Sequence, residues 1–211
     1  MGIIVKAGSS EPKELIPAGN YVARCYRMIH IGTSWDDMWD KAINRVRVTW
    51  ELPTETRVFN EDKGPQPFVI DKEYTLSLHE KANLRKDLES WRGKSFTEAE
   101  LEQFDITKLV GAYCMLNIIH NTTKKGVEYA MVSTIASIPK GIPKPEAVNE
   151  DLIWDFENNF DTNVLKSFPD FIKDRILGSN EYEDCMNALE GAEFEKQMEA
   201  SEPADKDDLP F

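Results

Sequence analysis

The sequence has little of what secreted and membrane proteins need. Its three cysteines, Cys25, Cys114 and Cys185, are odd in number and far apart, which argues against a disulfide framework and against the paired spacing of a zinc site. It contains no run of about 18 apolar residues, so no membrane-spanning helix is expected. The first residues also lack the apolar region of a signal peptide. We therefore expect a cytoplasmic protein with reduced thiols and no membrane partner.

Motifs of catalysis are scarce as well. The sequence has no glycine-rich loop of the kind that cradles phosphates and no nucleophile motif, and its three histidines are scattered. Asp36, Asp37 and Asp40 could be read as metal ligands, but no supporting histidine accompanies them and acidic loops are common. We expect no enzyme activity, no cofactor and no metal site.

Acidic residues are plentiful but unevenly placed. Residues 1–140 carry 19 Lys and Arg against 19 Asp and Glu, whereas residues 141–211 carry 6 against 19, so the net charge of −13 belongs to the last third. A neutral first part can still present a basic groove on one face. The acidic part cannot bind phosphates, but it can bind a basic partner or the groove itself.

Alternating apolar and polar residues predict strands in the first two thirds. The pattern is clearest at residues 44–52, where Val46, Val48 and Trp50 share one face until Pro53 stops it. The other predicted strands cover residues 21–31, 68–78, 109–120 and 127–135, with loops at 32–41, 54–67 and 121–126. In the first strand the phase changes near Arg27, which suggests a bulge or bend.

Two helices are predicted between the third and fourth strands. Ser77 and Glu80 have capping-box spacing, and Gly93 is placed to end the helix that follows. A second capping box, Thr97 with Glu100, opens a short helix. Five strands with a helix between the third and fourth predict a mainly β protein with an OB-fold, a five-stranded, partly open barrel. Another small barrel or an α+β sandwich remains open.

The last third differs in pattern. Apolar residues at helical spacing predict a helical extension over residues 141–195, interrupted at Pro169 and at Gly178, with a last helix over 181–194. The predicted organisation is a lead-in at 1–16, the OB-fold domain at 17–140, this extension, and a disordered acidic tail at 196–211.

Several residues suit single-stranded DNA, which is held by cations and by aromatic rings on which bases stack. In an OB-fold the groove crosses the second and third strands, flanked by the loops after the first and the fourth. The predicted DNA-binding residues are Arg24, Tyr26, Arg27, Trp35, Trp39, Arg45, Arg47, Lys124 and Lys125.

Each of these assignments has an ordinary structural alternative. Arg45 and Arg47 could be a solvated face, and Trp35 and Trp39 could fold onto the barrel rim. Among the other aromatic residues, Trp50 and Trp91 are expected in the core, whereas Tyr74, Tyr113 and Tyr129 stay open between core and groove.

The final residues, Asp207, Asp208, Leu209, Pro210 and Phe211, form an aromatic and acidic tip of the kind captured through a terminal carboxylate. This tip resembles the Asp-Asp-hydrophobic-Pro-Phe ending of bacterial and phage single-stranded DNA-binding proteins. Residues 84–96 and 117–121 bear a looser, overall likeness to phage replication and recombination proteins.

The resemblance implies a protein that coats single strands, in the host cytoplasm if phage-encoded. It also implies recruitment of a polymerase, helicase, primase or recombinase through the tip. The helical extension and the insertion at 54–67 depart from the bacterial pattern, so the usual tetramer is in doubt and the oligomeric state stays open. Two alternatives remain: an acidic DNA mimic that inhibits DNA-processing enzymes, suggested by the net charge, and a phage assembly or scaffold protein.

Overall fold

The computed structural model describes residues 14–201, which fall into two compact units. Unit 1 contains the chain up to Arg27, Val48–Lys72 and Leu78–Leu152, and unit 2 contains Met28–Arg47, Glu73–Ser77 and the chain from Ile153 onward. The division cuts through the first three strands, each of which contributes to both units.

The sequence predicts the type of most elements correctly, but their boundaries less often. In chain order they are β1 (Gly19–Asp36), β2 (Lys41–Asn60), η1 (Glu61–Lys63), β3 (Gly64–Thr75), α1 (Asn83–Arg92), α2 (Glu98–Glu102), η2 (Ile106–Leu109), β4 (Tyr113–Thr122), β5 (Glu128–Ala136), β6 (Leu152–Trp154), α3 (Thr162–Ser167), α4 (Asp170–Leu177) and α5 (Asn180–Ser201).

The strands are ordered β3-β2-β1-β4-β5, and β6 pairs with β1. The five main strands form a curled antiparallel half-barrel, which confirms the prediction of a mainly β fold followed by helices. In the register of β1 and β4, Ala23 lies opposite Cys114, and both side chains are fully buried. The register of β4 against β5 shifts between Asn117 and Ile118, as at a β-bulge. β3 and β5 are the outer strands of the half-barrel.

The core of unit 1 lies between the sheet and α1. Trp50 and Trp91 are buried as predicted, with ring centroids 5.9 Å apart. The Trp91 indole N–H donates to the Tyr113 carbonyl at 2.9 Å, and the Ser90 hydroxyl donates to the Ile135 carbonyl at 2.5 Å. Burying side chains of this size stabilises a fold by roughly 1.5–3 kcal/mol each, so these contacts fix α1 against β2, β4 and β5.

Helix boundaries followed local signals in most places. Gly93 ends α1 in the left-handed conformation with φ 67°, and Thr97 and Glu100 form the predicted capping box of α2. The capping box predicted at residues 77–80 is wrong, because α1 begins at Asn83 after an N-cap, Ala82, that makes no side-chain hydrogen bond.

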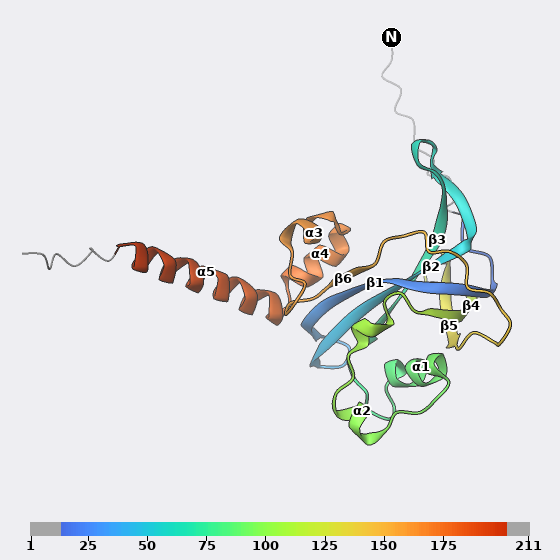
Figure 1. Ribbon diagram of the computed structural model, residues 1–211, viewed down its shortest axis with the longest axis horizontal. Helices are drawn as coiled ribbons and strands as arrows, with labels where there is room; N and C mark the ends of the chain where they lie inside the picture. Colours follow the sequence, from blue (N-terminus) through green and yellow to red (C-terminus); the bar gives the residue numbers. More distant parts are fainter. Residues whose placement is uncertain (1–13, 202–211) are drawn as a thin grey trace, which may run out of the picture. The chain divides into compact units, whose positions relative to one another are not determined.

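Two predicted loops are mostly strand. β2 continues through Pro53 to Asn60 and returns in β3, so residues 54–67 belong to a long hairpin (Figure 1). Proline lacks only its own backbone N–H. A strand tolerates this loss at a position where no neighbouring strand accepts that N–H. The loop predicted at 32–41 narrows to a turn at residues 37–40 because β1 extends to Asp36.

Unit 2 has an aromatic core of its own. The Trp154 ring lies 5.1 Å from Phe156, 5.7 Å from Phe160 and 6.0 Å from Phe168, measured between centroids. The Trp154 indole N–H donates to the Asp161 carbonyl at 3.0 Å, and the Asp161 side chain caps α3. The aromatic residues of the helical extension are therefore used largely to build this core.

The extension departs from prediction at both ends. Leu152–Trp154 is a strand paired with β1 and not helical, and the Asp155 carboxylate then accepts three successive backbone N–H groups, which holds a turn. The interruptions at Pro169 and Gly178 are confirmed as the two ends of α4. α5 runs to Ser201, past the predicted end at residue 194.

Candidate nucleic-acid interface

The predicted basic residues of β2 converge on one carboxylate in unit 2. Arg45 and Arg47 are two residues apart on a strand, so they lie on one face. Both contact Glu73 of β3: the Arg45 Nε lies 3.7 Å from Glu73 Oε1, and the Arg47 Nη1 lies 3.8 Å from Glu73 Oε2. Arg45 also pairs with Asp36 of β1.

α4 adds a third guanidinium to the same carboxylate. Arg175 forms a two-pronged pair with Glu73, with Nη1 to Oε2 at 2.6 Å and Nη2 to Oε1 at 2.8 Å. These hydrogen bonds raise the pKa of the Arg175 guanidinium above its ordinary value, against the effect of burial. We call Arg45, Arg47 and Arg175 the arginine cluster. Its guanidinium groups are held by the carboxylates of Glu73 and Asp36.

The β1–β2 turn of unit 2 presents two indole rings. Trp35 is 62% exposed and Trp39 is 66% exposed. The carboxylate of Asp36 accepts the backbone N–H groups of Met38 at 3.0 Å and Trp39 at 3.2 Å. Asp36 therefore shapes the turn and pairs with Arg45, which gives this acidic residue a structural role beside two exposed rings.

Arg24 is placed differently from its prediction. Its side chain is buried in unit 1, where Nη1 donates to Glu51 Oε1 at 2.9 Å and to the Asn149 carbonyl at 3.0 Å, and Nη2 pairs with Asp151. Glu51 is fully buried and also accepts from the Asn149 backbone N–H at 2.7 Å. This network fixes the segment after β5 to the sheet, so Arg24 is a structural residue and not part of an open surface.

Tyr26 and Arg27 lie half-buried on the unit 1 part of β1. The Arg27 guanidinium lies 5.6 Å from the centroid of the Tyr26 ring, and its Nε donates to the Thr49 hydroxyl at 3.3 Å. Burial raises the pKa of the Tyr26 hydroxyl, although the neighbouring Arg27 opposes the rise. The pair offers a ring and a cation, but less openly than the β1–β2 turn does.

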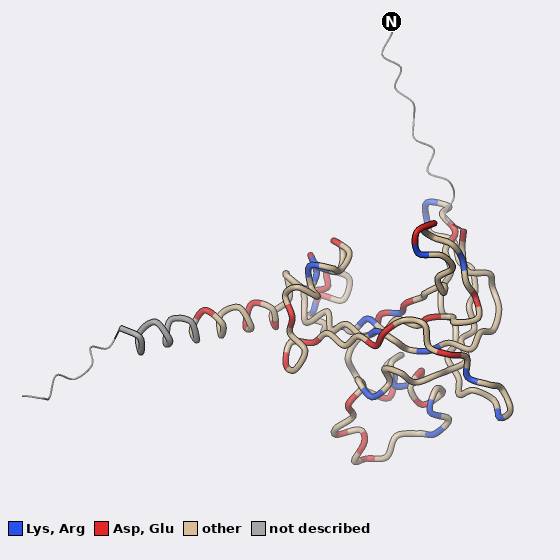
Figure 2. The backbone as a smooth tube through the Cα atoms, turned by 45° about the horizontal axis from the view of Figure 1, so that its top comes forward, with Lys and Arg blue, Asp and Glu red and all other residues tan. Residues whose placement is uncertain are grey.

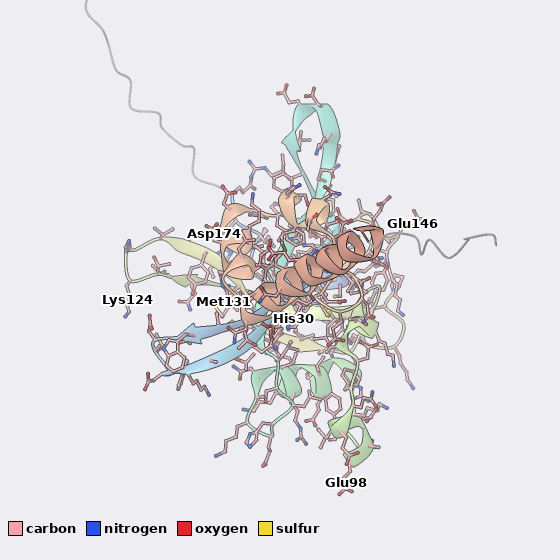
Figure 3. The ribbon with its side chains drawn as sticks, turned by 90° about the vertical axis from the view of Figure 1, so that its left-hand side faces the viewer. His30, Glu98, Lys124, Met131, Glu146 and Asp174 are labelled. Carbon is pink, nitrogen blue, oxygen red and sulfur yellow. The ribbon has the colours of Figure 1, made fainter. Side chains whose placement is uncertain are left out.

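Lys124 and Lys125 lie exposed in the β4–β5 hairpin of unit 1, where Figure 3 labels Lys124 at the tip. The Thr123 N–H donates to the Val127 carbonyl at 2.9 Å, and Gly126 has φ 78°, a conformation that glycine adopts without strain. This tight turn holds both lysines out into solvent.

A groove in unit 1 was missed by sequence reasoning. A cavity of 560 Å³ lies between the outer strands β3 and β5, lined in part by Phe59, Phe68 and Tyr129. The Phe59 and Phe68 rings meet edge to face at 5.3 Å, and the Arg57 guanidinium lies 6.0 Å from the Phe59 ring. Phe59 lies in residues 54–67, which the sequence pattern predicts as a loop, so the pattern alone does not point to this ring. The adjacent apolar pair Val58 and Phe59 was the available signal.

The remaining chemistry of the described chain is sparse. Figure 2 shows acidic and basic residues interspersed along the strands, and only acidic ones on the described first half of α5. Among the side chains that the structure describes, no three of His, Cys, Asp or Glu gather where they could hold a metal ion. None of the helices described there combines the length and the hydropathy needed to cross a membrane. Burial raises the pKa of the Cys25 thiol to about 12.

Comparisons of the chain with protein-family models, with curated proteins and with solved structures find no match. The predicted tip at residues 207–211 lies outside the described residues. The function must therefore be argued from the side chains of the two units.

Proposed function

We propose that this protein binds single-stranded DNA without sequence preference and coats it during phage replication, recombination and repair. The observation that carries the proposal is the exposure of Trp35 and Trp39 on the same hairpin as Arg45. The other three tryptophans, Trp50, Trp91 and Trp154, are buried. Exposed rings beside cations suit a single strand, because each stacked base contributes roughly 1–3 kcal/mol.

We further propose that the half-barrel is an OB-fold. Its strand order, β3-β2-β1-β4-β5, and the position of α1 between β3 and β4 support this assignment. The groove between β3 and β5 is what a partly open barrel would leave. In unit 2 the proposed contacts of the strand are Trp35, Trp39, Arg45 and Arg47. In unit 1 they are Tyr26, Arg27, Lys124 and Lys125, without Arg24.

Partner recruitment through residues 207–211 is a second part of the proposal. It rests on the sequence pattern of an aromatic residue beside acids, which fits a basic, apolar pocket on a replication or recombination protein. The proposal allows either a monomer or a homo-oligomer, because a chain can coat DNA in both states.

A titration with oligo-dT tests the proposal. We expect binding at low salt to quench tryptophan fluorescence and to weaken steeply as salt rises, since phosphate contacts release counterions. Trp35→Ala with Trp39→Ala should remove most of the quench, because the three other indoles are buried. Duplex DNA and oligo-rU serve as comparisons.

The outcome also separates the alternatives. A chain that leaves oligo-dT unbound at low salt but captures basic DNA-processing proteins would be a DNA mimic, and the proposal would be wrong. Large assemblies seen by light scattering without DNA, together with no binding, would indicate a scaffold protein.

A further inference from the structure

α4 has two faces with different surroundings. Ile172 and Ile176 are buried and four residues apart, so they form its inward face. Phe171 and Arg175 are also four apart and form a second face, on which Phe171 is 55% exposed. The aromatic core of unit 2 is made by Trp154 and its neighbours, so the Phe171 ring is not needed there.

This second face adjoins the basic face of β2. The Arg47 guanidinium lies 5.2 Å from the centroid of the Phe171 ring, and Arg175 meets Glu73 beside Arg45 and Arg47. An exposed ring, with a guanidinium next to it and two more around a shared carboxylate, is therefore assembled from β2, β3 and α4 within one unit.

We propose that α4 forms part of the single-strand binding surface, with a base stacked on Phe171 and a backbone phosphate bound by Arg175 and Arg47. This proposal rests on the proposed function and deepens it, since it gives the helical extension a direct role on DNA. The phosphate shares with Glu73 the guanidinium donors that Glu73 holds in the free protein. The exposed ring favours nucleic acid over an acidic peptide, because a peptide carboxylate needs the arginines but not a stacking platform.

Two substitutions in the full chain test this surface by oligo-dT anisotropy over a range of salt concentrations. Phe171→Leu keeps an apolar side chain but removes the ring, and we expect the affinity to fall about fivefold or more with the salt slope unchanged. Arg175→Gln should weaken binding and reduce the slope of log K against log salt by about one.

Two matched controls lie on the same helix. Lys173→Gln removes one positive charge from a side chain that is 29% exposed, against 35% for Arg175, and that pairs with Asp170. Leu177→Ala shortens another exposed apolar side chain. Both controls should keep the affinity within about twofold of wild type, because neither side chain belongs to the proposed contact.

The outcomes separate this inference from the proposed function. If wild type binds and both test variants bind as the controls do, α4 is not part of the surface, while strand binding itself stands. If wild type does not bind at all, both proposals fail. If Arg175→Gln lowers the thermal midpoint, its weaker binding could come from lost stability. The affinity of Phe171→Leu then tests the inference alone, because an exposed ring contributes little to folding. If Phe171→Leu binds DNA normally but Arg175→Gln loses an acidic peptide, the surface serves a protein partner and the inference is overturned.

Discussion

At the scale of single residues, Glu73 organises the basic side of unit 2. Its carboxylate contacts Arg45, Arg47 and Arg175, whose side chains come from two different elements. Without it the three guanidinium groups would repel one another. On the proposed binding surface Glu73 occupies donors that a phosphate would use, so it would both hold the cluster together and compete with the phosphate.

We predict opposite effects of Glu73→Gln on folding and on binding. The free energy of unfolding should fall by about 1–2 kcal/mol, because a half-buried ion-pair partner is lost. Affinity for oligo-dT at low salt should rise several-fold, because the cluster gains a positive charge and loses a competitor. Urea unfolding and anisotropy measure the two effects. An affinity lowered as much as in Arg175→Gln would mean that Glu73 positions the arginines and does not compete.

At the scale of elements, α5 is attached at its first turn. Glu181 accepts hydrogen bonds from the Thr33 N–H at 2.6 Å, the Thr33 hydroxyl at 2.6 Å and the Asn44 amide at 3.2 Å. Gly32 has φ 88°, and a Cβ there would lie 2.6 Å from the Ser179 side chain. Close approach and a shared carboxylate thus tie the start of α5 to β1 and β2 within unit 2.

This attachment should depend on pH. Burial alone would raise the pKa of the Glu181 carboxyl, but the hydrogen bonds from Thr33 outweigh burial and keep the pKa below its ordinary value. A carboxyl with a lowered folded pKa contributes stability above its unfolded pKa of about 4.3, and the contribution is lost as the pH falls through the folded value.

Thermal unfolding measures this contribution. Glu181→Gln should be less stable than wild type near about pH 6, and the two proteins should converge as the pH falls toward about 3. Glu183→Gln, which changes an exposed acid on the same helix, should follow wild type throughout. A constant difference between wild type and Glu181→Gln across the range would show that the Glu181 charge is not the stabilising group.

At the scale of the whole molecule, charge is divided along the chain. The net charge of −13 lies in residues 141–211, yet within that part Arg175 joins Arg45 and Arg47 around Glu73. The proposed DNA binding therefore depends on local charge and not on the total. Acidic residues late in the chain, in contrast, compete with DNA for any basic surface they reach.

Deletion of residues 207–211 tests this division. It removes Asp207 and Asp208, so the affinity for oligo-dT should stay equal or rise, most clearly at low salt where screening is weak. Binding to a partner captured through the tip should be lost. Asp207→Asn with Asp208→Asn, which keeps the chain length, separates charge from length. A large loss of DNA affinity on deletion would contradict the prediction.

The sequence by itself determined the features that depend on residues close together in the chain, such as the buried face of a strand and the ends of helices. The alternation through Val48 and Trp50 identified the buried face of β2, and Gly93 marked the end of α1. Pro169 and Gly178 marked the two ends of α4. These features depend on the spacing of apolar residues and on local backbone conformation, both of which can be predicted from a short stretch of sequence.

Only the tertiary structure decided which charges meet. Arg24 and Arg45 look alike in the sequence, yet Glu51 and the segment after β5 bury the first, while the second lies half-buried beside Glu73 and Asp36. Likewise Leu152–Trp154 has apolar spacing that suits a helix and becomes a strand because β1 supplies its partner. Pairing between distant segments leaves no period in the sequence, so the arginine cluster could be seen only once β2, β3 and α4 were assembled.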